Sequence, residues 1–245
     1  MIPKIIHTFW GGDRNIYECS CLKNWEEILK PAGYEINVIT DSQIDKSACE
    51  WVEFMYDNKQ WAHLSDYYRF LLVNKHGGFW FDTDIFVHKP FDELLELEYV
   101  MAKARDKRYT KRHEYTNGYV HDSCIPGFMC LSMFGMIENH WIADIALKYY
   151  NNMGGFNPET FNKFEMIIGR IMWKAFENAG VCIDYNTYLD FDDNTKVPVS
   201  DILKTELENP DKLITLPSTF FDCCEKDKVY YHQYASHLHY GLWTV

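Results

Sequence analysis

Apolar and polar residues follow two different periods along the N-terminal part of the chain, and each period predicts a kind of element. The run IPKIIHTFW, closed by Gly11-Gly12, is typical of a buried first strand. Residues 20–31 predict a helix that ends before Pro31, and residues 34–40 predict a second strand. A strand, a helix and a strand at this spacing indicate an α/β unit with a parallel sheet.

The next segment predicts a central helix followed by an aromatic strand. Apolar side chains at helical spacing place one face of an amphipathic helix over residues 61–75, before a glycine stop at Gly77: Leu64, Tyr68, Leu71 and Leu72. A strand is predicted at 79–87. Further strands are predicted at 99–104, 127–133, 213–216 and 229–237, helices at 139–151 and 161–177, and irregular structure at 186–210.

The length and the even composition predict one domain over residues 1–245. A chain of 245 residues can bury a substantial core, and it has no repeats or low-complexity linkers. The formal charge of -12 argues against a nucleic-acid partner and against simple electrostatic docking on anionic lipid. The basic segment 103–112 is expected to be a solvated loop, although it would also suit an anionic acceptor.

The lack of a recognisable targeting signal and the spacing of the cysteines predict a cytoplasmic protein. No signal peptide precedes the first strand, and no apolar run approaches the roughly 18–20 residues of a transmembrane segment. The eight cysteines follow no metal or disulfide spacing, which favours reduced thiols. Peripheral attachment at the inner membrane face is compatible with this location.

Two carboxylates at a strand end carry the strongest chemical signal. Asp82 and Asp84 alternate with apolar residues in FWFDTDIF, which predicts that both face one side of the strand. Such a pair suits Mn²⁺ or Mg²⁺, which keeps positions open for phosphate oxygens. A bound cation would also offset the cost of burying two carboxylates. The alternative is that the chain simply turns into solvent at Asp82.

Three further residues have both a functional and a structural interpretation. Asp66 and Arg69 are three residues apart on the preceding helix, a spacing that suits an ion pair on the protein surface. The functional interpretation is that Asp66 accepts hydrogen bonds from sugar or ribose hydroxyls and that Arg69 donates to sugar hydroxyls or phosphate. Trp10 ends the first strand, where ligands gather in open α/β sheets, so its indole could stack on a base. A core tryptophan is the other interpretation.

The C-terminal segment contains a third group of candidate residues. His237 and His239 share one face if the segment is a strand, and an imidazole is an acceptable ligand beside two carboxylates. Structural histidines are the alternative. Trp243 is expected to close over the pocket or to cap the core.

Taken together, these motifs resemble glycosyltransferase family 32, the retaining sugar transferases with a DXD motif, which include fungal-type initiating α-1,6-mannosyltransferases and bacterial capsular polysaccharide enzymes. The resemblance rests on IPKIIHTFWGG, on HGGFWFDTDIFVHKP, and on a helical motif formed by Ala62, Ser65, Asp66, Arg69 and Val73. These segments cover about a third of the chain. The layout is also similar to the catalytic domain of the large clostridial glucosylating toxins.

The resemblance implies a GT-A fold, which is a Rossmann-like nucleotide-sugar-binding domain with a mainly parallel central sheet. It also implies a divalent cation and a nucleotide-sugar donor. By position, Asp82 and Asp84 would serve the cation, the diphosphate and the ribose, and Trp10 would stack on the base. Asp66 and Arg69 would hold the donor sugar.

The C-terminal segment departs from the family pattern. The family's HHWxxSW-like segment stands here as HLHYGLW (237–243), in which His237 and Trp243 align but the second histidine and the serine are replaced. The third metal ligand is therefore either His237 or His239. The expected serine contact to the leaving diphosphate is missing, and FEMIIGR near residue 165 does not match the family's usual signature there.

The expected activity is transfer of a hexosyl unit, with retention, from a nucleotide diphosphate sugar to a saccharide acceptor. A UDP-sugar is the expected donor, and a lipid-linked or growing surface polysaccharide is the expected acceptor. A haloacid-dehalogenase-like phosphatase is an alternative, because it also uses a DxD at a strand end; Asp192-Asp193 would suit its acidic motif. An inactive sugar-binding module is the third possibility.

Overall fold

The computed structural model describes residues 1–103, 129–153, 157–161, 168–184, 201, 212–214, 216, 220–221 and 233–238. Its centre is a five-stranded sheet with the order β2-β1-β3-β6-β5. The bounds are β1 Ile5–Trp10, β2 Glu35–Thr40, β3 Gly78–Phe81, β5 Tyr99–Lys103 and β6 Met129–Met136. Strand β1 pairs in parallel with β2 and β3, whereas β6 is antiparallel to both β3 and β5. Four strands therefore run one way and β6 runs the other, which confirms the predicted α/β class with a mainly parallel sheet.

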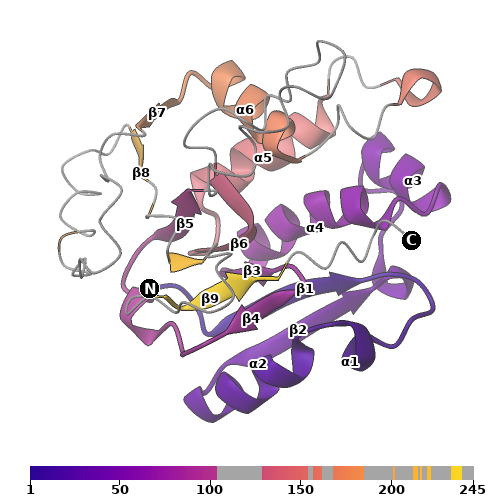
Figure 1. Ribbon diagram of the computed structural model, residues 1–245. Helices are drawn as coiled ribbons and strands as arrows, with labels where there is room; N and C mark the ends of the chain where they lie inside the picture. The colour runs from indigo at the N-terminus through magenta and orange to yellow at the C-terminus, as the bar shows by residue number, and fades with distance from the viewer. Residues whose placement is uncertain are drawn as a thin grey trace, which may run out of the picture.

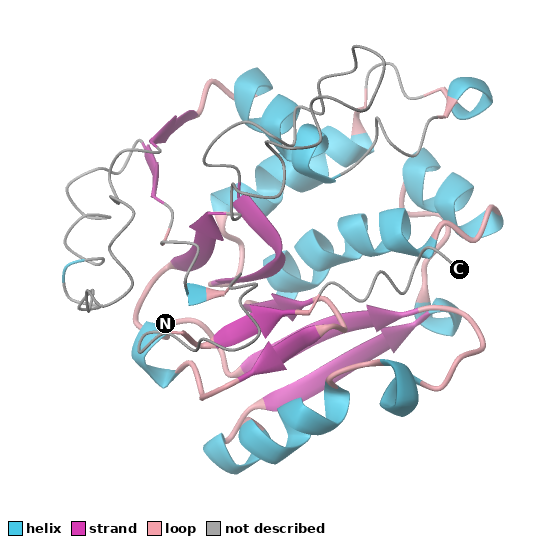
Figure 2. Cartoon of the chain, viewed as in Figure 1, coloured by secondary structure: helices cyan, strands magenta, loops and turns pink. Residues whose placement is uncertain are grey.

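Helices cover both faces of this sheet (Figures 1 and 2). Helix α4 packs on the central strands, with α3, α5 and α6 beyond it, and α1 and α2 lie on the opposite side. The bounds are α1 Ile16–Cys19, α2 Leu22–Ile28, α3 Glu50–Asp57, α4 Trp61–His76, α5 Trp141–Asn151 and α6 Ile168–Asn178. Single 3-10 turns occur at Lys30–Ala32, Asp41–Gln43, Asp92–Leu94 and Pro158–Thr160.

Two short strand pairs complete the described structure. Strand β4 (Ile85–Val87) pairs antiparallel with β9 (Ala235–His237), and β7 (Cys182–Asp184) pairs in parallel with β8 (Lys212–Ile214). The first pair brings the C-terminal part of the chain against the segment that follows β3.

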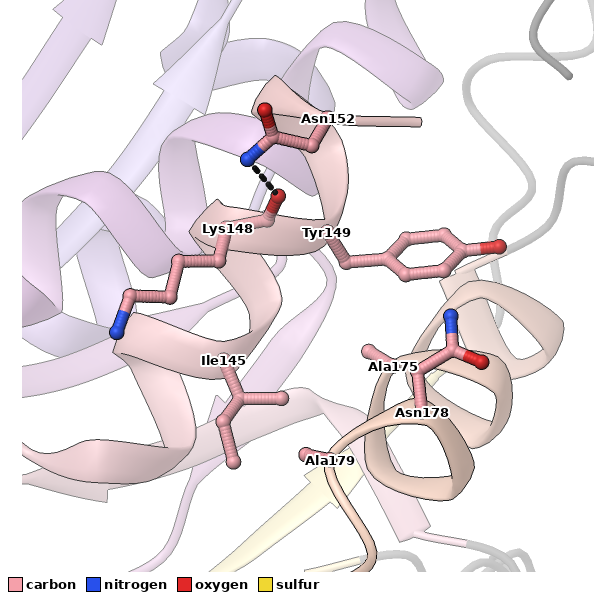
Figure 3. Close-up of a pocket in the computed structure, with 7 residues that line it drawn as sticks. All are labelled: Ile145, Lys148, Tyr149, Asn152, Ala175, Asn178 and Ala179. Atoms are coloured by element: carbon pink, nitrogen blue, oxygen red, sulfur yellow. Dashed lines mark hydrogen bonds between the residues drawn. The ribbon is translucent and has the colours of Figure 1, made fainter. Parts of the chain in front are cut away.

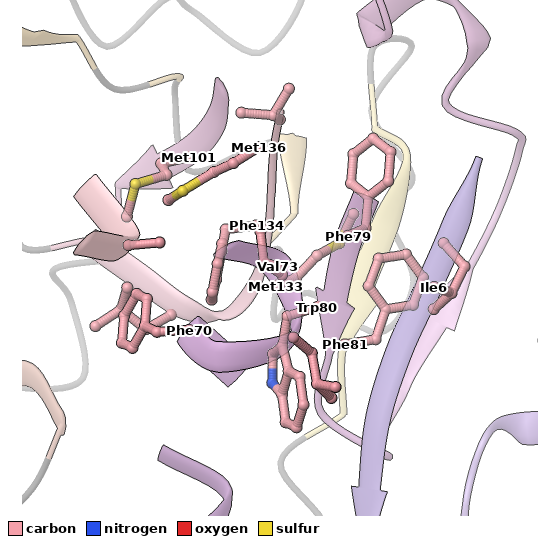
Figure 4. Packing of buried hydrophobic residues seen from close by; sticks show 14 of the residues in the cluster. Ile6, Phe70, Val73, Phe79, Trp80, Phe81, Met101, Met133, Phe134 and Met136 are labelled. Carbon is pink, nitrogen blue, oxygen red and sulfur yellow. The ribbon is translucent and has the colours of Figure 1, made fainter. Parts of the chain in front are cut away.

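Aromatic side chains fill the core on both faces of β3 (Figure 4). Phe79 and Phe81 each lie 5.4 Å from the ring of Phe91, which is packed beneath the sheet. On the α4 side, Phe70 stacks on Phe134 of β6 with 5.3 Å between the ring centroids. The alternation of β3 therefore sends Trp80 to the α4 side, away from its two phenylalanine neighbours.

Helix α4 is not the amphipathic helix that the sequence predicted. Ten of its residues are buried, including the charged Asp66 and Arg69, and Leu71 is only half-buried. The helix is enclosed because it lies between the sheet on one side and α3 and α5 on the other. Its predicted end is confirmed: Gly77 has φ 61° and its N–H donates to the carbonyl of Val73.

Other sequence-based expectations need correction. The prediction of one continuous strand at 79–87 is wrong, because strand β3 ends at Phe81 and residues 85–87 form β4 in a different sheet. Helix α3 and strand β7 were not predicted. Most of 186–210 lies outside the described residues, as do the basic segment 104–112, His239 and Trp243. Within the described ranges, no helix has the length and apolar character needed to cross a bilayer.

Candidate active site

The two carboxylates of the DxD segment follow directly on β3, in a turn held by its neighbours. The backbone N–H of Asp82 donates to the carbonyl of Ser132 in β6, at 2.7 Å. The carbonyl of Thr83 accepts from the N–H of Cys21, also at 2.7 Å, just before α2. This anchored turn, rather than strand alternation, fixes Asp82 and Asp84 at the carboxyl end of the sheet.

Arg69 connects helix α4 to this turn. Its Nη2 lies 2.6 Å from Oδ1 of Asp66 and 3.4 Å from Oδ1 of Asp82. The same nitrogen donates to Oγ of Ser65 at 3.2 Å, and Nη1 donates to the carbonyl of Leu131 at 2.5 Å. Arg69 thus lies between two carboxylates and uses both terminal nitrogens inside the protein.

Burial makes this ion-pair group different from a surface pair. The side chains of Arg69 and Asp66 are 5% and 9% exposed, so the solvated ion pair considered from the sequence is wrong. Asp82 keeps 24% exposure. Burial raises the pKa of Asp82, and nearby Asp84 adds to this, against the opposing effects of Arg69, His237 and the Trp80 hydrogen bond.

Strand β9 places His237 beside Asp84. Ile85 is the register partner of His237, and His237 Nε2 lies 3.3 Å from Oδ1 of Asp84. The N–H of Leu238 donates to the Asp84 carbonyl at 3.0 Å. Of the predicted site residues, Asp66, Arg69, Asp82, Asp84 and His237 therefore form one connected group.

The described residues do not by themselves complete a metal site. In these ranges no three His, Cys, Asp or Glu side chains are grouped so that they could hold an ion. His239, the other candidate ligand, and Trp243, the candidate lid, lie outside them.

Trp10 lies where the sequence placed it, at the carboxyl end of β1. It is 6% exposed, and its Nε1 donates to the carbonyl of Arg14 at 2.6 Å. It is buried, yet it does not belong to the main hydrophobic cluster of the described residues. Its position is thus on the edge where the acidic turn also lies.

Three buried side chains near the cluster were missed from the sequence. The indole Nε1 of Trp80 donates to Oδ1 of Asp82 at 2.9 Å. His63 Nδ1 lies 3.8 Å from Oδ2 of Asp66, and the pKa of Tyr150 is raised well above its usual range by burial and by Asp66. A period of two along β3 could have revealed Trp80, whereas Tyr150 comes from a different helix and carries no local signal.

Cys21 lies under the acidic turn but is not a candidate nucleophile. Burial raises the pKa of its thiol to about 12, and Asp84 contributes in the same direction. The reactive thiolate form is therefore suppressed at neutral pH.

A separate cavity of about 420 Å³ opens between α5 and α6 (Figure 3). Its lining residues are Ile145, Lys148, Tyr149, Asn152, Ala175, Asn178 and Ala179. None of them belongs to the acidic cluster, so this cavity is not the site that the motifs indicated.

The fold and the site define an α/β protein with a buried acidic cluster at the carboxyl end of a mainly parallel sheet, which is where such folds bind ligands. The model of the capsular polysaccharide synthesis protein family matches residues 4–154, more than half of the chain. The chain belongs to this family. No curated protein matches the sequence.

Several solved structures of glycosyltransferases are similar to this chain in fold. The PaToxG glycosyltransferase shares 15% identity over 73% of this chain and 70% of its own, with a TM-score of 0.46. The galactosyltransferase LgtC, solved with donor and acceptor sugar analogues, shares 10% over 70% of each chain, with a TM-score of 0.37. Mouse xyloside xylosyltransferase 1 in its apo form shares 10% over 96% of this chain and 97% of its own, with a TM-score of 0.41.

Proposed function

We propose that this protein is a metal-dependent glycosyltransferase of the retaining type. It moves a hexosyl unit from a nucleotide diphosphate sugar, with UDP as the expected nucleotide, to a saccharide in the synthesis of a surface polysaccharide. The observation that carries the proposal is the buried cluster of Asp66, Arg69, Asp82 and Asp84, which lies inside the segment that matches the family. The motif-level resemblance to glycosyltransferase family 32 supports the finer assignment.

The charges of the cluster fit a divalent cation. Asp66 and Asp82 both contact Arg69, and Asp84 acts on the charge of Asp82. Among the described residues of this cluster, three carboxylates thus face the single guanidinium of Arg69. Burying a carboxylate without a compensating positive charge destabilises the fold, because the desolvation penalty is on the order of several kcal/mol per ion. Oxygen ligands with an adjacent imidazole suit Mn²⁺ or Mg²⁺. In this proposal Asp82 and Asp84 hold the ion, and the third ligand is either His237 or His239. Asp82, Asp84 and His237 are not grouped closely enough in the described structure to hold an ion by themselves, so these side chains would have to draw together when the ion binds.

Each residue of the cluster then has a task. A bound cation would offset the negative charge that grows on the departing diphosphate. Asp66 accepts hydrogen bonds from hydroxyl groups of the donor sugar through Oδ2, because its Oδ1 is paired with Arg69. Arg69 fixes the positions of the Asp66 and Asp82 carboxylates and places a positive charge beside the sugar. Trp10 offers its ring to the base, and Trp243 closes over the donor.

The proposed chemistry is a front-side displacement. The acceptor oxygen bonds to the anomeric carbon while the bond from that carbon to the diphosphate oxygen breaks, and the acceptor proton passes to the leaving phosphate. The configuration is retained because attack and departure share one face. Of the described cysteines near the turn, Cys21 is held as a thiol, so it does not offer a covalent route.

A donor panel tests this function. The native chain and an Asp84→Asn variant are incubated with UDP- and GDP-sugars, with manganese or with a chelator, and released nucleotide diphosphate is measured. The proposal expects one preferred donor, whose turnover needs the metal and falls at least a hundredfold in the variant. Release of inorganic phosphate from simple phosphoesters, with no turnover of any nucleotide sugar, would instead identify a phosphatase. Donor binding without turnover in any acceptor screen would identify a sugar-binding module.

A further inference from the structure

We propose that Trp80 is a positioning residue for the cation site, because its indole N–H fixes which oxygen of Asp82 faces the ligand. The inference rests on the proposed function and adds a residue that no motif assigned. Trp80 is 1% exposed, and its Nε1 lies 2.9 Å from Oδ1 of Asp82.

The bond joins two residues of one strand end. Trp80 lies in β3 on the side of α4, and its indole N–H reaches Asp82, which follows the end of the strand two residues later. The backbone of Asp82 is held separately through Ser132. The side chain and the backbone of Asp82 thus have independent anchors.

The indole also supports the arginine that contacts the same carboxylate. The guanidinium carbon of Arg69 lies 5.3 Å from the centroid of the Trp80 ring, within the range of a cation–π contact. Arg69 Nη2 approaches Oδ1 of Asp82 at 3.4 Å. One aromatic side chain therefore donates to Asp82 through its edge and carries Arg69 on its face.

Both groups approach the same carboxylate oxygen. Oδ1 of Asp82 accepts the indole N–H and forms an ion pair with the guanidinium, whereas no hydrogen bond or ion pair from the described residues reaches Oδ2. Oδ1 is thereby occupied, and Oδ2 is the oxygen left to bind a cation. Asp82 would act as a ligand through one oxygen, in an orientation that Trp80 sets.

Partners of this kind matter because they orient the ligand before the ion arrives. Removing a hydrogen bond to a metal-binding side chain typically weakens metal affinity by about 10–100-fold. A buried tryptophan with only a packing role would change stability on removal, without a specific effect on the ion. This difference separates the two roles of Trp80.

The test replaces one atom group of the indole. Trp80 is exchanged for 3-benzothienylalanine, which keeps the bicyclic shape and has sulfur in place of N–H, and Trp80→Phe is made as a genetically encoded second variant. The dissociation constant for Mn²⁺ is measured by electron paramagnetic resonance, beside the urea midpoint and the KM for the preferred donor. We expect a rise in the Mn²⁺ dissociation constant of about tenfold or more in both variants, with a near-native urea midpoint for the isostere.

The same exchange at Trp51 is the matched control. Trp51 is also 1% exposed, and its Nε1 donates to the backbone carbonyl of His63 at 3.2 Å. Its isostere is expected to bind Mn²⁺ with native affinity. Native Mn²⁺ affinity in the folded Trp80 isostere would overturn the role of Trp80 and leave the proposed function intact. Absence of any Asp84-dependent Mn²⁺ binding in the native chain would overturn the cation site itself, and this inference with it.

Discussion

At the scale of single residues, the site depends on one buried arginine among carboxylates. Arg69 contacts both Asp66 and Asp82 with Nη2. Burial lowers the pKa of Arg69, but the Coulombic effects of Asp82 and Asp66 outweigh it and raise the pKa. Its guanidinium also holds the carbonyl of Leu131. A single point charge on a flexible lysine stem could not make these contacts in the same geometry.

Replacement of Arg69 by methionine is therefore expected to destabilise the fold strongly. Asp66 and Asp82 would be left buried without their cation, at a cost of about 3–5 kcal/mol in the free energy of unfolding. Urea denaturation of the native chain and the variant measures this cost.

The control for this experiment is an ion pair of equal length on the surface. Lys148 Nζ lies 2.6 Å from Asp144 Oδ2, as Arg69 does from Asp66, but the Lys148 side chain is 70% exposed. Lys148→Met should change the free energy of unfolding by less than about 0.5 kcal/mol. Equal effects of the two substitutions would show that burial of the cluster has been overstated.

At the scale of elements, the close approach of β3 to β1 depends on Gly78. Its φ is 94°, and a Cβ atom there would lie 2.5 Å from the carbonyl oxygen of Ile5. Gly33 has a similar φ of 84°, but a Cβ atom at that position would meet nothing within 4 Å. An alanine at either position would thus adopt a similar positive φ, but only at Gly78 would its Cβ atom also meet a neighbouring strand.

Gly78→Ala should consequently destabilise the protein more than Gly33→Ala. Positive φ alone costs an alanine on the order of 1 kcal/mol, and at Gly78 the strand pair must also move apart. Thermal unfolding of the two variants measures the difference. A Tm for Gly78→Ala at or above that of Gly33→Ala would contradict the packing of β3 on β1.

The packing of β1 against the end of α4 also gives the fold a dependence on pH. His7 is 1% exposed, its Nε2 contacts the carbonyl of Gly77 at 2.9 Å, and burial lowers its pKa to about 4. The unfolded chain binds a proton at this histidine below about pH 6.5, whereas the folded chain stays neutral until about pH 4. The free energy of unfolding must then fall as the pH falls through this window.

A His7→Gln variant isolates this contribution. Between pH 6 and pH 4.5 its free energy of unfolding should fall less steeply than that of the native chain, by up to about 1.4 kcal/mol per pH unit. Urea titrations at several pH values give both slopes, and the carboxylates common to both proteins cancel. Identical slopes would mean that His7 binds its proton with the same pKa in the folded and the unfolded chain, which would contradict the lowered pKa.

The local pattern of apolar and polar residues predicted where most helices and strands lie, but it did not predict how deeply they are buried. The period of α4, its glycine end and the Asp66–Arg69 spacing could all be read from residues 61–77. Its enclosure could not, because α3 and α5 cover the face that a helical wheel leaves to solvent. The break after Phe81 was missed because Asp82 and Asp84 continue the alternation of the strand.

At the scale of the whole molecule, a segment far away in sequence adds a residue to the cluster. Strand β9 returns to pair with β4, so that His237 becomes the partner of Ile85 and reaches Asp84. The motif comparison named His237 as a candidate, but only the strand pairing shows which carboxylate it approaches. No local pattern encodes a register between segments so far apart.

His237→Gln is expected to weaken Mn²⁺ binding at least tenfold. His88→Gln is the control, because His88 lies at the other end of the same strand pair, with Nε2 at 2.8 Å from Oγ of Ser236. Both variants disturb the β4–β9 pair, whereas only the first removes an imidazole from Asp84. Equal loss of Mn²⁺ affinity in the two would assign the effect to the strand pair and not to the imidazole.

We propose that the acidic cluster is a cation-dependent site for a nucleotide sugar. Calorimetric titration of UDP and GDP into the native chain and into Asp84→Asn, with manganese or with a chelator, tests this binding without the need for an acceptor. We expect one nucleotide to bind in the presence of manganese, and we expect the chelator or the substitution to raise its dissociation constant at least tenfold. Binding of neither nucleotide, or binding that is unchanged in Asp84→Asn, would contradict it.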